Sequence, residues 1–284
     1  MVRLIHSTQE LTDIRSTEKR QLGFVPTMGN LHAGHISLLE KALIDNEVVY
    51  FSIFVNPKQF GPSEDFKSYP RTLEYYLSLI EKCESQFPNK DVIVFAPKSA
   101  QEIFPEGHDT QVSVTNFNRI LEGEFRPDHF NGVSTVVFRL FDLVKPHKTY
   151  FGLKDYQQYL VIRQMTKDLA LPVEVIGMPI IREDSGLALS SRNQYLNNEQ
   201  KGPALTISES LNKVARIISG KKENISAAAE EIKSLLKDSK WNYLEIRDAE
   251  TLSRDLTLSS KITILGVYQL GSTRLLDNLQ MEIE

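Results

Sequence analysis

Two histidines three residues apart, His32 and His35, stand in the stretch PTMGNLHAGH at residues 26–35. In the first turn of a helix this spacing points both imidazoles to the same side, where they can reach one anion. Gly29 and Gly34 would let a nucleotide approach the backbone closely, and a helix N-terminus offers N–H groups and a positive dipole end. The stretch therefore predicts a phosphate-binding turn. Helix capping and metal binding are the alternatives that a match of only four residues, His32–His35, leaves open.

The pattern His-x-Gly-His is neither the glycine-rich signature of dinucleotide folds nor that of P-loop enzymes. A zinc site would need further histidine or cysteine ligands. The remaining histidines are scattered and form no motif with the single cysteine, Cys83; they are His6, His108, His129 and His147.

The elements around this turn alternate between strands and helices. Residues 23–26 and 48–55 have the composition of buried strands, and residues 35–46 have the apolar spacing of an amphipathic helix. The alternation continues with predicted helices at 71–83, 132–144 and 157–169 and predicted strands at 91–95, 148–151 and 173–176. Strands separated by helices indicate a mainly parallel sheet covered on both faces. The turn follows the carboxyl end of a strand, where such sheets bind their ligands.

After residue 177 the pattern changes. A loop-rich segment through residue 198 precedes two predicted helices, 201–219 and 225–237, the second with Ser226 as its candidate cap. Strands are then predicted at 243–247 and 261–267. Helices followed by neighbouring strands indicate a smaller α+β domain, so we expect domains at 1–177 and 178–284.

Composition limits the class of protein. The chain has 284 residues, a formal charge of −4 and 41% hydrophobic residues, which is typical of globular proteins with one large domain or two ordinary ones. One cysteine cannot form an intrachain disulfide and fits a reducing compartment. The N-terminus has no apolar signal region, and no apolar run approaches the roughly 20 residues of a membrane span. We expect a cytoplasmic protein without nucleic-acid or membrane partners.

The turn resembles the HIGH motif of nucleotidyl-transferring α/β enzymes, and the longer pattern resembles the pantoate–β-alanine ligases, or pantothenate synthetases. Further segments match that family in order: FVNPKQF at 54–60, YPRT at 69–72, LEG at 121–123 with RPDHF at 126–130, FGLKDYQQ at 151–158 and GLALSSRN at 186–193. The resemblance covers residues 22 to about 196. It implies a Rossmann-like parallel sheet with helices on both faces, plus a smaller C-terminal α+β lid domain.

The resemblance also implies a reaction. Members of the family condense pantoate with β-alanine, using ATP, through a pantoyl-adenylate, and release diphosphate and then AMP. Catalysis of the first step would rest on positioning and on cationic stabilisation of the phosphorus, with Mg²⁺ bound mainly through the ATP phosphates. Family members are typically homodimers, and residues 48–55 are a candidate for part of that contact.

The residues implied to bind ATP are Met28, Gly29, Asn30, Leu31, His32, Ala33, Gly34, His35, Gly152, Leu153, Lys154, Asp155, Ile181, Leu189, Ser190, Ser191 and Arg192. Of these, His32, His35 and Lys154 are the implied catalytic residues, with His35 as the candidate proton donor to the departing group. The segment Leu189–Arg192 is the implied counterpart of a KMSKS-type loop.

The implied pantoate ligands are Gln59 and Gln158, and Gln59 is also implied to bind β-alanine. An amide suits this task because it presents one acceptor and two donors to a hydroxyl and a carboxylate. The resemblance also implies that Asn56, Glu122 and Arg126 lie near the pantoate and β-alanine sites, without a specific ligand contact.

Simpler interpretations exist for several of these residues. Lys154 and Asp155 alone predict a solvated charge pair, and Ser190 with Ser191 predicts a helix cap. Two positions depart from the family pattern: Leu153 replaces a commonly polar residue, and Tyr75–Tyr76 replaces a frequent acidic pair. The second departure removes an acidic contribution to magnesium, so we predict no protein metal ligand.

Two other functions compete with the ligase. A different HIGH-motif enzyme would transfer an adenylyl or cytidylyl group to another coenzyme precursor and keep the nucleotide in its product. A catalytically inactive module would only bind the nucleotide. The joint presence of both histidines, Lys154 and both glutamines favours the ligase.

Overall fold

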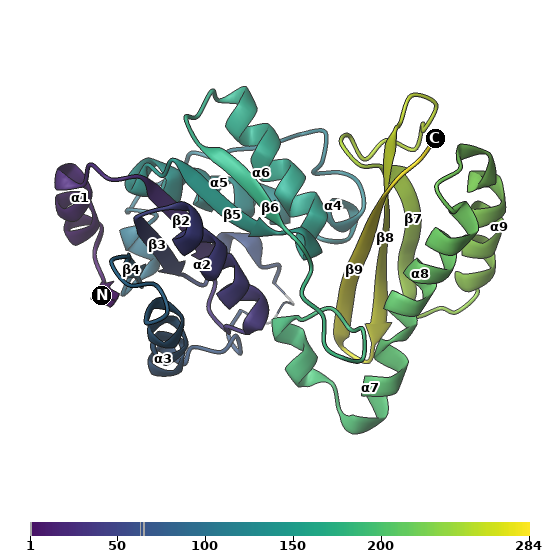
Figure 1. Ribbon diagram of the computed structural model, residues 1–284, viewed down its shortest axis with the longest axis horizontal. Coiled ribbons are helices and arrows are strands. Elements are labelled where there is room, and N and C mark those ends of the chain that lie inside the picture. The colour runs from purple at the N-terminus through teal and green to yellow at the C-terminus, as the bar shows by residue number, and fades with distance from the viewer. Residues whose placement is uncertain (1, 63, 65) are drawn as a thin grey trace. The chain divides into compact units, whose positions relative to one another are not determined.

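Strands and helices alternate through the first part of the computed structural model, which describes residues 2–62, 64 and 66–284 (Figure 1). The strands of this part are β1 (Val2–Ile5), β2 (Leu22–Thr27), β3 (Val48–Ile53), β4 (Asp91–Phe95), β5 (Lys148–Gly152) and β6 (Glu174–Met178). The helices are α1 (Thr8–Thr17), α2 (Ala33–Asp45), α3 (Leu73–Glu84), α4 (Glu122–Phe125), α5 (His129–Val144) and α6 (Tyr156–Asp168).

All six strands form one parallel sheet in the order β1-β4-β3-β2-β5-β6. Strand β3 lies between β2 and β4 and pairs with both along its length. Its residues Val48–Phe51 are fully buried within one chain. These four residues are therefore not open to a partner, whereas Ile53 and Val55 are half-buried, and a dimer contact through residues 48–55 stays a prediction.

Helices cover both faces of this sheet. Neighbouring side chains on a strand point to opposite faces, so Val25 of β2 packs in the core with α2 and α3, whereas the ring of Phe24 meets Phe141 of α5 edge-on at 6.3 Å. Helix α2 packs through Leu38, Leu39, Ala42 and Leu43, which recur at helical spacing and are all buried. The predicted parallel α/β sheet with helices on both faces is confirmed.

The rest of the chain forms an antiparallel sheet with helices packed on it. Its strands are β7 (Trp241–Asp248), β8 (Lys261–Leu270) and β9 (Thr273–Glu282), in that order across the sheet, and its helices are α7 (Asn198–Ala204), α8 (Thr206–Ile218) and α9 (Ile225–Leu235). Helix α8 packs on β8 and β9 through Ile207, Leu211, Val214 and Ile218, none of which is more than 1% exposed. This is the predicted smaller α+β part.

The contacts divide the described residues into two units. The first runs to Leu153 and resumes at Gln157–Pro179; the second contains Lys154–Tyr156 and Ile180–Glu284. Lys154, Asp155 and Tyr156, the first residue of α6, therefore group with the C-terminal sheet, although in the sequence they lie among the elements of the first unit.

Several elements differ from the sequence prediction. Strand β1, helix α1 and strand β9 were not predicted. The helix expected at 201–219 is two helices that meet at Leu205, because Pro203 near the end of α7 cannot supply a helix N–H. Helix α9 begins at Ile225 after Asn224, so Ser226 is not its cap.

Two further predictions concern single features. Cys83 is a free, buried cysteine on α3, and burial together with nearby Glu40 and Glu84 raises the pKa of its thiol to about 11. Within residues 2–62, 64 and 66–284, no helix has the length and apolar character needed to cross a membrane.

Candidate active site

The sheet reverses its strand order between β2 and β5. From β2 the chain continues to β3 and β4 on one side, and it then returns to β5 and β6 on the other. The carboxyl ends of two strands that flank such a reversal form the usual ligand crevice of an open parallel sheet. Strand β2 ends at Thr27, and β5 ends at Gly152. Both segments predicted to bind nucleotide in this unit, Met28–His35 and Gly152–Leu153, thus follow the two flanking strands.

The turn after β2 has a backbone that few residues adopt. Gly29 has φ +88° and Asn30 has φ +49°, a region open to glycine and tolerated by asparagine. Thr27 connects the turn to β3, because its Oγ accepts a hydrogen bond from Gly29 N at 3.2 Å and donates one to Ser52 O at 2.7 Å. The ring of Tyr76 covers Gly29 so closely that a Cβ there would lie 3.0 Å from the ring.

His32 and His35 cap helix α2 reciprocally. His32 is the N-cap, and its Nδ1 accepts from Gly34 N at 3.1 Å; His35 Nδ1 accepts from His32 N at 3.3 Å. The two rings lie against each other in a tilted arrangement, with centroids 4.1 Å apart and planes at 47°. The motif is a capping box built from two imidazoles instead of the usual hydroxyl and carboxyl residues.

This cap determines which ring nitrogen carries the proton. A nitrogen that accepts from a backbone N–H needs its lone pair, so Nδ1 is unprotonated in both rings and a neutral ring holds its proton on Nε2. An imidazolium would place two N–H groups against each other and break the cap. The two histidines are therefore suited to donate through Nε2–H as neutral rings. They would stabilise phosphate by hydrogen bonds and not, as expected from the sequence, by a positive charge.

Gln59 lies in a short helical turn, Pro57–Gln59, and is 8% exposed. Buried Asn56 fixes its amide. Oδ1 of Asn56 accepts from Lys58 N at 3.1 Å, so the other end of Asn56 is Nδ2, which donates to Gln59 Oε1 at 3.0 Å and to Gly132 O at 3.1 Å. Because Oε1 of Gln59 is already used, Nε2 is the half of its amide that remains to bind a ligand.

A chain of three side chains supports the main chain of Gln59. His129 donates from Nδ1 to Gln59 O at 2.9 Å, and its Nε2 accepts from Arg126 at 3.1 Å. Arg126 in turn makes two bonds to Glu64, at 2.9 and 2.6 Å. Burial raises the pKa of the Glu64 carboxyl, but the bonds and charge of Arg126 lower it further, so the net pKa lies below its usual range. His129 and Glu64 were not predicted as supporting residues, since nothing in their spacing links them to Gln59.

The two glutamines at the start of α6 have different surroundings. Gln157 is buried, donates to Phe117 O and Ile120 O at 2.7 and 2.8 Å, and accepts from Glu122 N at 3.1 Å. Gln158, the predicted pantoate ligand, is half-buried. Gln157 therefore fixes the loop before α4. The sequence alone could not distinguish this structural glutamine from Gln158, the predicted pantoate ligand.

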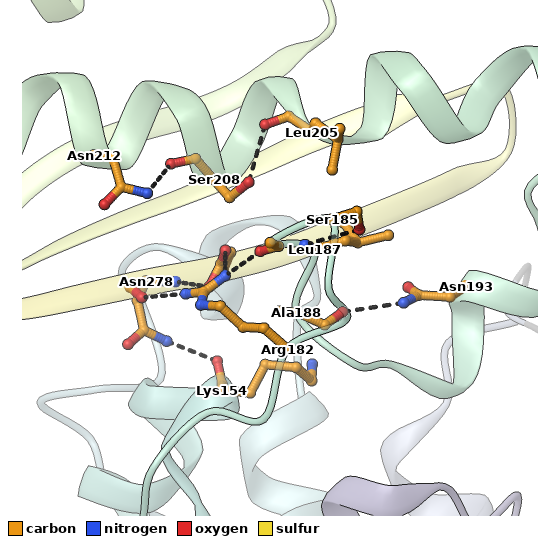
Figure 2. Close-up of polar contacts among 12 residues, drawn as sticks. Lys154, Arg182, Ser185, Leu187, Ala188, Asn193, Leu205, Ser208, Asn212 and Asn278 are labelled. Carbon is orange, nitrogen blue, oxygen red and sulfur yellow. Dashed lines mark hydrogen bonds and ion pairs between the residues drawn. The ribbon is translucent and has the colours of Figure 1, made fainter.

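In the second unit, Lys154 and Asp155 form an ion pair with Nζ and Oδ1 2.9 Å apart. The Lys154 side chain is only 19% exposed, whereas that of Asp155 is 44% exposed. Asn278 of β9 donates from Nδ2 to the main-chain oxygen of Lys154 at 2.8 Å (Figure 2). The charge pair that the sequence suggested exists, but it is partly buried and fastened to a strand.

The segment with the other ATP-binding candidates is a hairpin. Ile181 and Leu189 are joined by a hydrogen bond, Arg182 bridges to Ala188, and Gly186 makes the turn with φ +92°. Ser190 then caps the short helical segment Ser191–Tyr195 by accepting from Arg192 N at 3.2 Å. Asn193 ties this segment back to the hairpin through a bond to Ala188 O at 3.0 Å, which Figure 2 shows. The cap that Ser190 suggested in the sequence is thus present.

The two departures from the family pattern have packing roles. Tyr76 is 2% exposed, covers Gly29 and donates to Pro70 O at 3.2 Å. Leu153 lies over Gly177 of β6, where a Cβ would come within 2.6 Å of its side chain. Over the described part of the chain, His, Cys, Asp and Glu side chains form no group of three that could hold a metal ion.

An apolar cavity of about 390 Å³ lies at the carboxyl ends of β2, β3 and β4 in the first unit. Its lining includes Met28, Ile53, Phe54, Tyr76 and Arg71. Met28 is the one predicted ATP-binding residue among the described residues of this lining, and neither predicted pantoate ligand belongs to it. The described lining of the cavity and the predicted pantoate ligands therefore have no residue in common.

Comparisons with known proteins cover both units. A family model described as pantoate-beta-alanine ligase matches residues 1–280. Proteins named pantothenate synthetase are similar along nearly the whole chain: that of Thermosipho africanus is 43% identical over 92% of both chains, and that of Acetivibrio thermocellus is 41% identical over 99% of this chain and 100% of its own.

Solved structures agree with these sequence matches. The pantothenate synthetase of Thermus thermophilus has a TM-score of 0.86 at 41% identity over 98% of both chains. The pantoate-beta-alanine ligase of Francisella tularensis, complexed with beta-gamma ATP and beta-alanine, has a TM-score of 0.72 at 31% identity over 98% of this chain and 97% of that chain.

Proposed function

Because this chain belongs to the pantoate–β-alanine ligase family, we propose that the capped turn Met28–His35 is the centre at which it activates pantoate with ATP. The enzyme is an AMP-forming ligase that makes the amide of pantothenate from pantoate and β-alanine through a pantoyl-adenylate. The observation that carries our assignment of the centre is the reciprocal histidine cap at the first turn of α2, beside the reversal of strand order.

The first step needs donors for a crowded triphosphate. A carboxylate oxygen of pantoate attacks the α-phosphorus, and the bond from that phosphorus to the bridging oxygen breaks to release diphosphate. The N–H groups and positive dipole end of α2 favour these phosphates. His32 and His35 add Nε2–H donors whose rings are already oriented by their Nδ1 bonds, so little reorganisation accompanies the transition state. His35 acts on the departing diphosphate by this donation.

The second unit carries the cationic residues that we assign to ATP binding. Lys154 Nζ is held by Asp155, and triphosphate oxygens would compete with that carboxylate for it. Ser190, Ser191 and Arg192 add hydroxyl and guanidinium donors in one short segment. We therefore treat the first unit as the nucleotide- and pantoate-binding domain and the second as the lid domain, with Lys154 assigned to the second.

Pantoate is bound by Gln59 and Gln158, and β-alanine by Gln59. The hydrogen bond from Asn56 leaves Gln59 Nε2 as the donor for an anionic substrate. In the second step the β-alanine amine attacks the acyl carbon of the adenylate and AMP leaves with the former carboxylate oxygen.

Replacement Gln59→Glu tests this orientation. Glutamate keeps an oxygen for Asn56 but places a negative charge where Nε2 donated, so we expect the KM for pantoate to rise by about 100-fold or more, with a much smaller change in the KM for ATP. Steady-state kinetics with each substrate varied in turn measure this. An unchanged pantoate KM would remove Gln59 from the pantoate site.

Replacement Gly152→Ala tests the ATP site. In the described structure a Cβ at Gly152 meets no atom within 4 Å, so the variant should fold with an unchanged melting temperature. If the nucleotide passes close to this strand end, the added methyl should weaken ATP binding by on the order of tenfold. Calorimetric titration with a non-hydrolysable ATP analogue measures the affinity; wild-type affinity would place the nucleotide elsewhere.

Magnesium enters this account through ATP. Apart from Asp155, whose carboxylate is paired with Lys154, the polar side chains assigned to the site are amides, hydroxyls and basic groups, whereas Mg²⁺ prefers carboxylate, phosphate and water oxygens. We propose that Mg²⁺ is held mainly by the ATP phosphates, where it would neutralise their charge. We also propose a cytoplasmic homodimer whose partners are its small-molecule substrates, without nucleic-acid or membrane partners.

The deciding assay supplies ATP, pantoate and β-alanine and follows AMP and pantothenate together. We expect AMP to form only with pantoate, and pantothenate to match it in amount. A nucleotidyltransferase would retain the nucleotide in its product, and an inactive module would form no AMP. AMP formation that needs no pantoate, or no consumption of β-alanine, would overturn the proposal.

A further inference from the structure

Two consecutive residues of β9, Asp277 and Asn278, hold the two separate segments that supply the proposed phosphate ligands of the second unit. Asp277 binds Arg182 of the hairpin, and Asn278 binds the main chain at Lys154. Both strand residues are buried, with 3% and 2% exposure. Figure 2 shows Lys154, Arg182 and Asn278 side by side. Neither strand residue lies within the stretches that resemble the family motifs.

Arg182 fastens the hairpin to β9. Its guanidinium makes two bonds to Asp277, at 2.6 and 2.9 Å, and one to Gly186 O at 3.0 Å, at the turn of the hairpin. The Asp277 side chain is fully buried. A paired, planar contact of this kind fixes direction as well as distance, so the position of the hairpin is set by β9, and Ser190–Arg192 follow directly from its second strand.

Asn278 fastens Lys154. Its Nδ2 donates to Lys154 O at 2.8 Å, and its Oδ1 accepts from Gln280, which fixes the orientation of the amide. The backbone N of Asn278 donates to Asp277 Oδ1 at 2.8 Å, so the two residues also orient each other.

Strand β9 holds both contacts in fixed positions. It pairs with β8 along its whole length, from Thr273 to Glu282, and Asp277 and Asn278 lie at the middle of that ladder. Lys154 and the hairpin therefore keep a constant separation as long as the two contacts persist.

We propose that Asp277 and Asn278 are a positioning pair that sets the spacing between Lys154 and the segment Ser190–Arg192 for the triphosphate of ATP. The inference rests on the proposed ATP-binding role of those residues. Neither Asp277 nor Asn278 is a catalytic residue, because each acts through the segment that it holds.

Replacement Asn278→Ala removes the bond to Lys154 without adding charge. We expect the KM for ATP to rise by on the order of tenfold, with the KM for pantoate close to that of the wild type. The melting temperature should fall, because Lys154 O and Gln280 lose a buried partner. The matched control is Asn242→Ala on β7, where the asparagine bonds Arg274 and Gln269 in the same sheet and touches neither segment; it should leave both KM values unchanged.

Replacement Asp277→Asn weakens the pairing with Arg182. Its control is Glu245→Gln, which weakens an equally short ion pair, from Glu245 to Arg247 at 2.6 Å, elsewhere in this sheet. Both variants should lose stability, but only Asp277→Asn should raise the KM for ATP, again by on the order of tenfold. If Asp277→Asn does not fold, the comparison of Asn278→Ala with Asn242→Ala still tests whether Asn278 positions Lys154.

Binding of a non-hydrolysable ATP analogue separates positioning from a general structural effect. If Asn278 acts through Lys154, Asn278→Ala should weaken binding in the wild-type background but not in a Lys154→Ala background. The wild type is assayed first: if it forms no pantoate-dependent AMP, the proposed function fails. If it is active and Asn278→Ala behaves like Asn242→Ala, or weakens binding equally in both backgrounds, the positioning pair is refuted.

Discussion

Replacement of His35 by glutamate is expected to lower pantoate-dependent AMP formation by about 10²- to 10³-fold without unfolding the protein. Glutamate is a usual residue at the third position of a capping box, so its carboxylate can accept from His32 N as the imidazole Nδ1 does. An ionised carboxylate has no N–H group, so the variant keeps the helix cap and removes the Nε2–H donor. Single-turnover AMP formation and thermal unfolding measure the two effects separately.

The matched variant is His35→Ala, which removes the cap bond as well as the donor. It should lose activity to a similar extent and also lose about 1 kcal/mol of stability. If His35→Glu is as active as the wild type, His35 is only a cap, and the proposed phosphate contact is wrong.

Replacement of Gly132 by alanine is expected to destabilise the first unit strongly. A Cβ there would lie 2.3 Å from Lys58 O and 2.7 Å from Gln59 N, which are main-chain atoms that cannot rotate away. Helix α5 would have to move away from the turn that carries Gln59, and the bonds from Asn56 to Gly132 and from His129 to Gln59 would be strained. We expect a loss on the order of 3 kcal/mol, together with a raised KM for pantoate.

Its control is Gly152→Ala at the end of β5, where a Cβ meets nothing within 4 Å in the described structure. That variant should leave the free energy of unfolding close to that of the wild type. Chemical denaturation of both variants gives the two free energies of unfolding. A Gly132→Ala variant as stable as Gly152→Ala would mean that α5 does not rest on this turn.

The sequence predicted the parallel sheet because the apolar runs of β2 to β6 and the helices between them alternate clearly. It missed strand β1 (Val2–Ile5), because only Ile5 of this strand is buried and the strand lacks a strong apolar pattern. It also missed helix α1. It also missed β9, in which buried Asp277 and Asn278 interrupt the apolar alternation. Those polar residues are buried because they bind segments distant in the chain, and such pairing leaves no local pattern.

The candidate site was predictable in part. The spacing of His32 and His35 indicated two rings on one side of a helix start, but the same spacing serves a cap and a ligand site, and the structure contains the cap. Which of Gln157 and Gln158 is buried depends on the rotation of α6, which two adjacent glutamines cannot indicate. Lys154 groups with the second unit, where its main chain is bonded to Asn278 and neighbouring Tyr156 is bonded to Ala249, both residues far away in the sequence.

Transfer of oxygen from pantoate to AMP tests the central claim most directly. Pantoate labelled with ¹⁸O in its carboxylate is incubated with the enzyme, ATP and β-alanine, and the products are analysed by mass spectrometry. A pantoyl-adenylate requires that one carboxylate oxygen leave with AMP, so the predicted result is AMP with one ¹⁸O and unlabelled diphosphate. Unlabelled AMP, or label in inorganic phosphate, would contradict the mechanism.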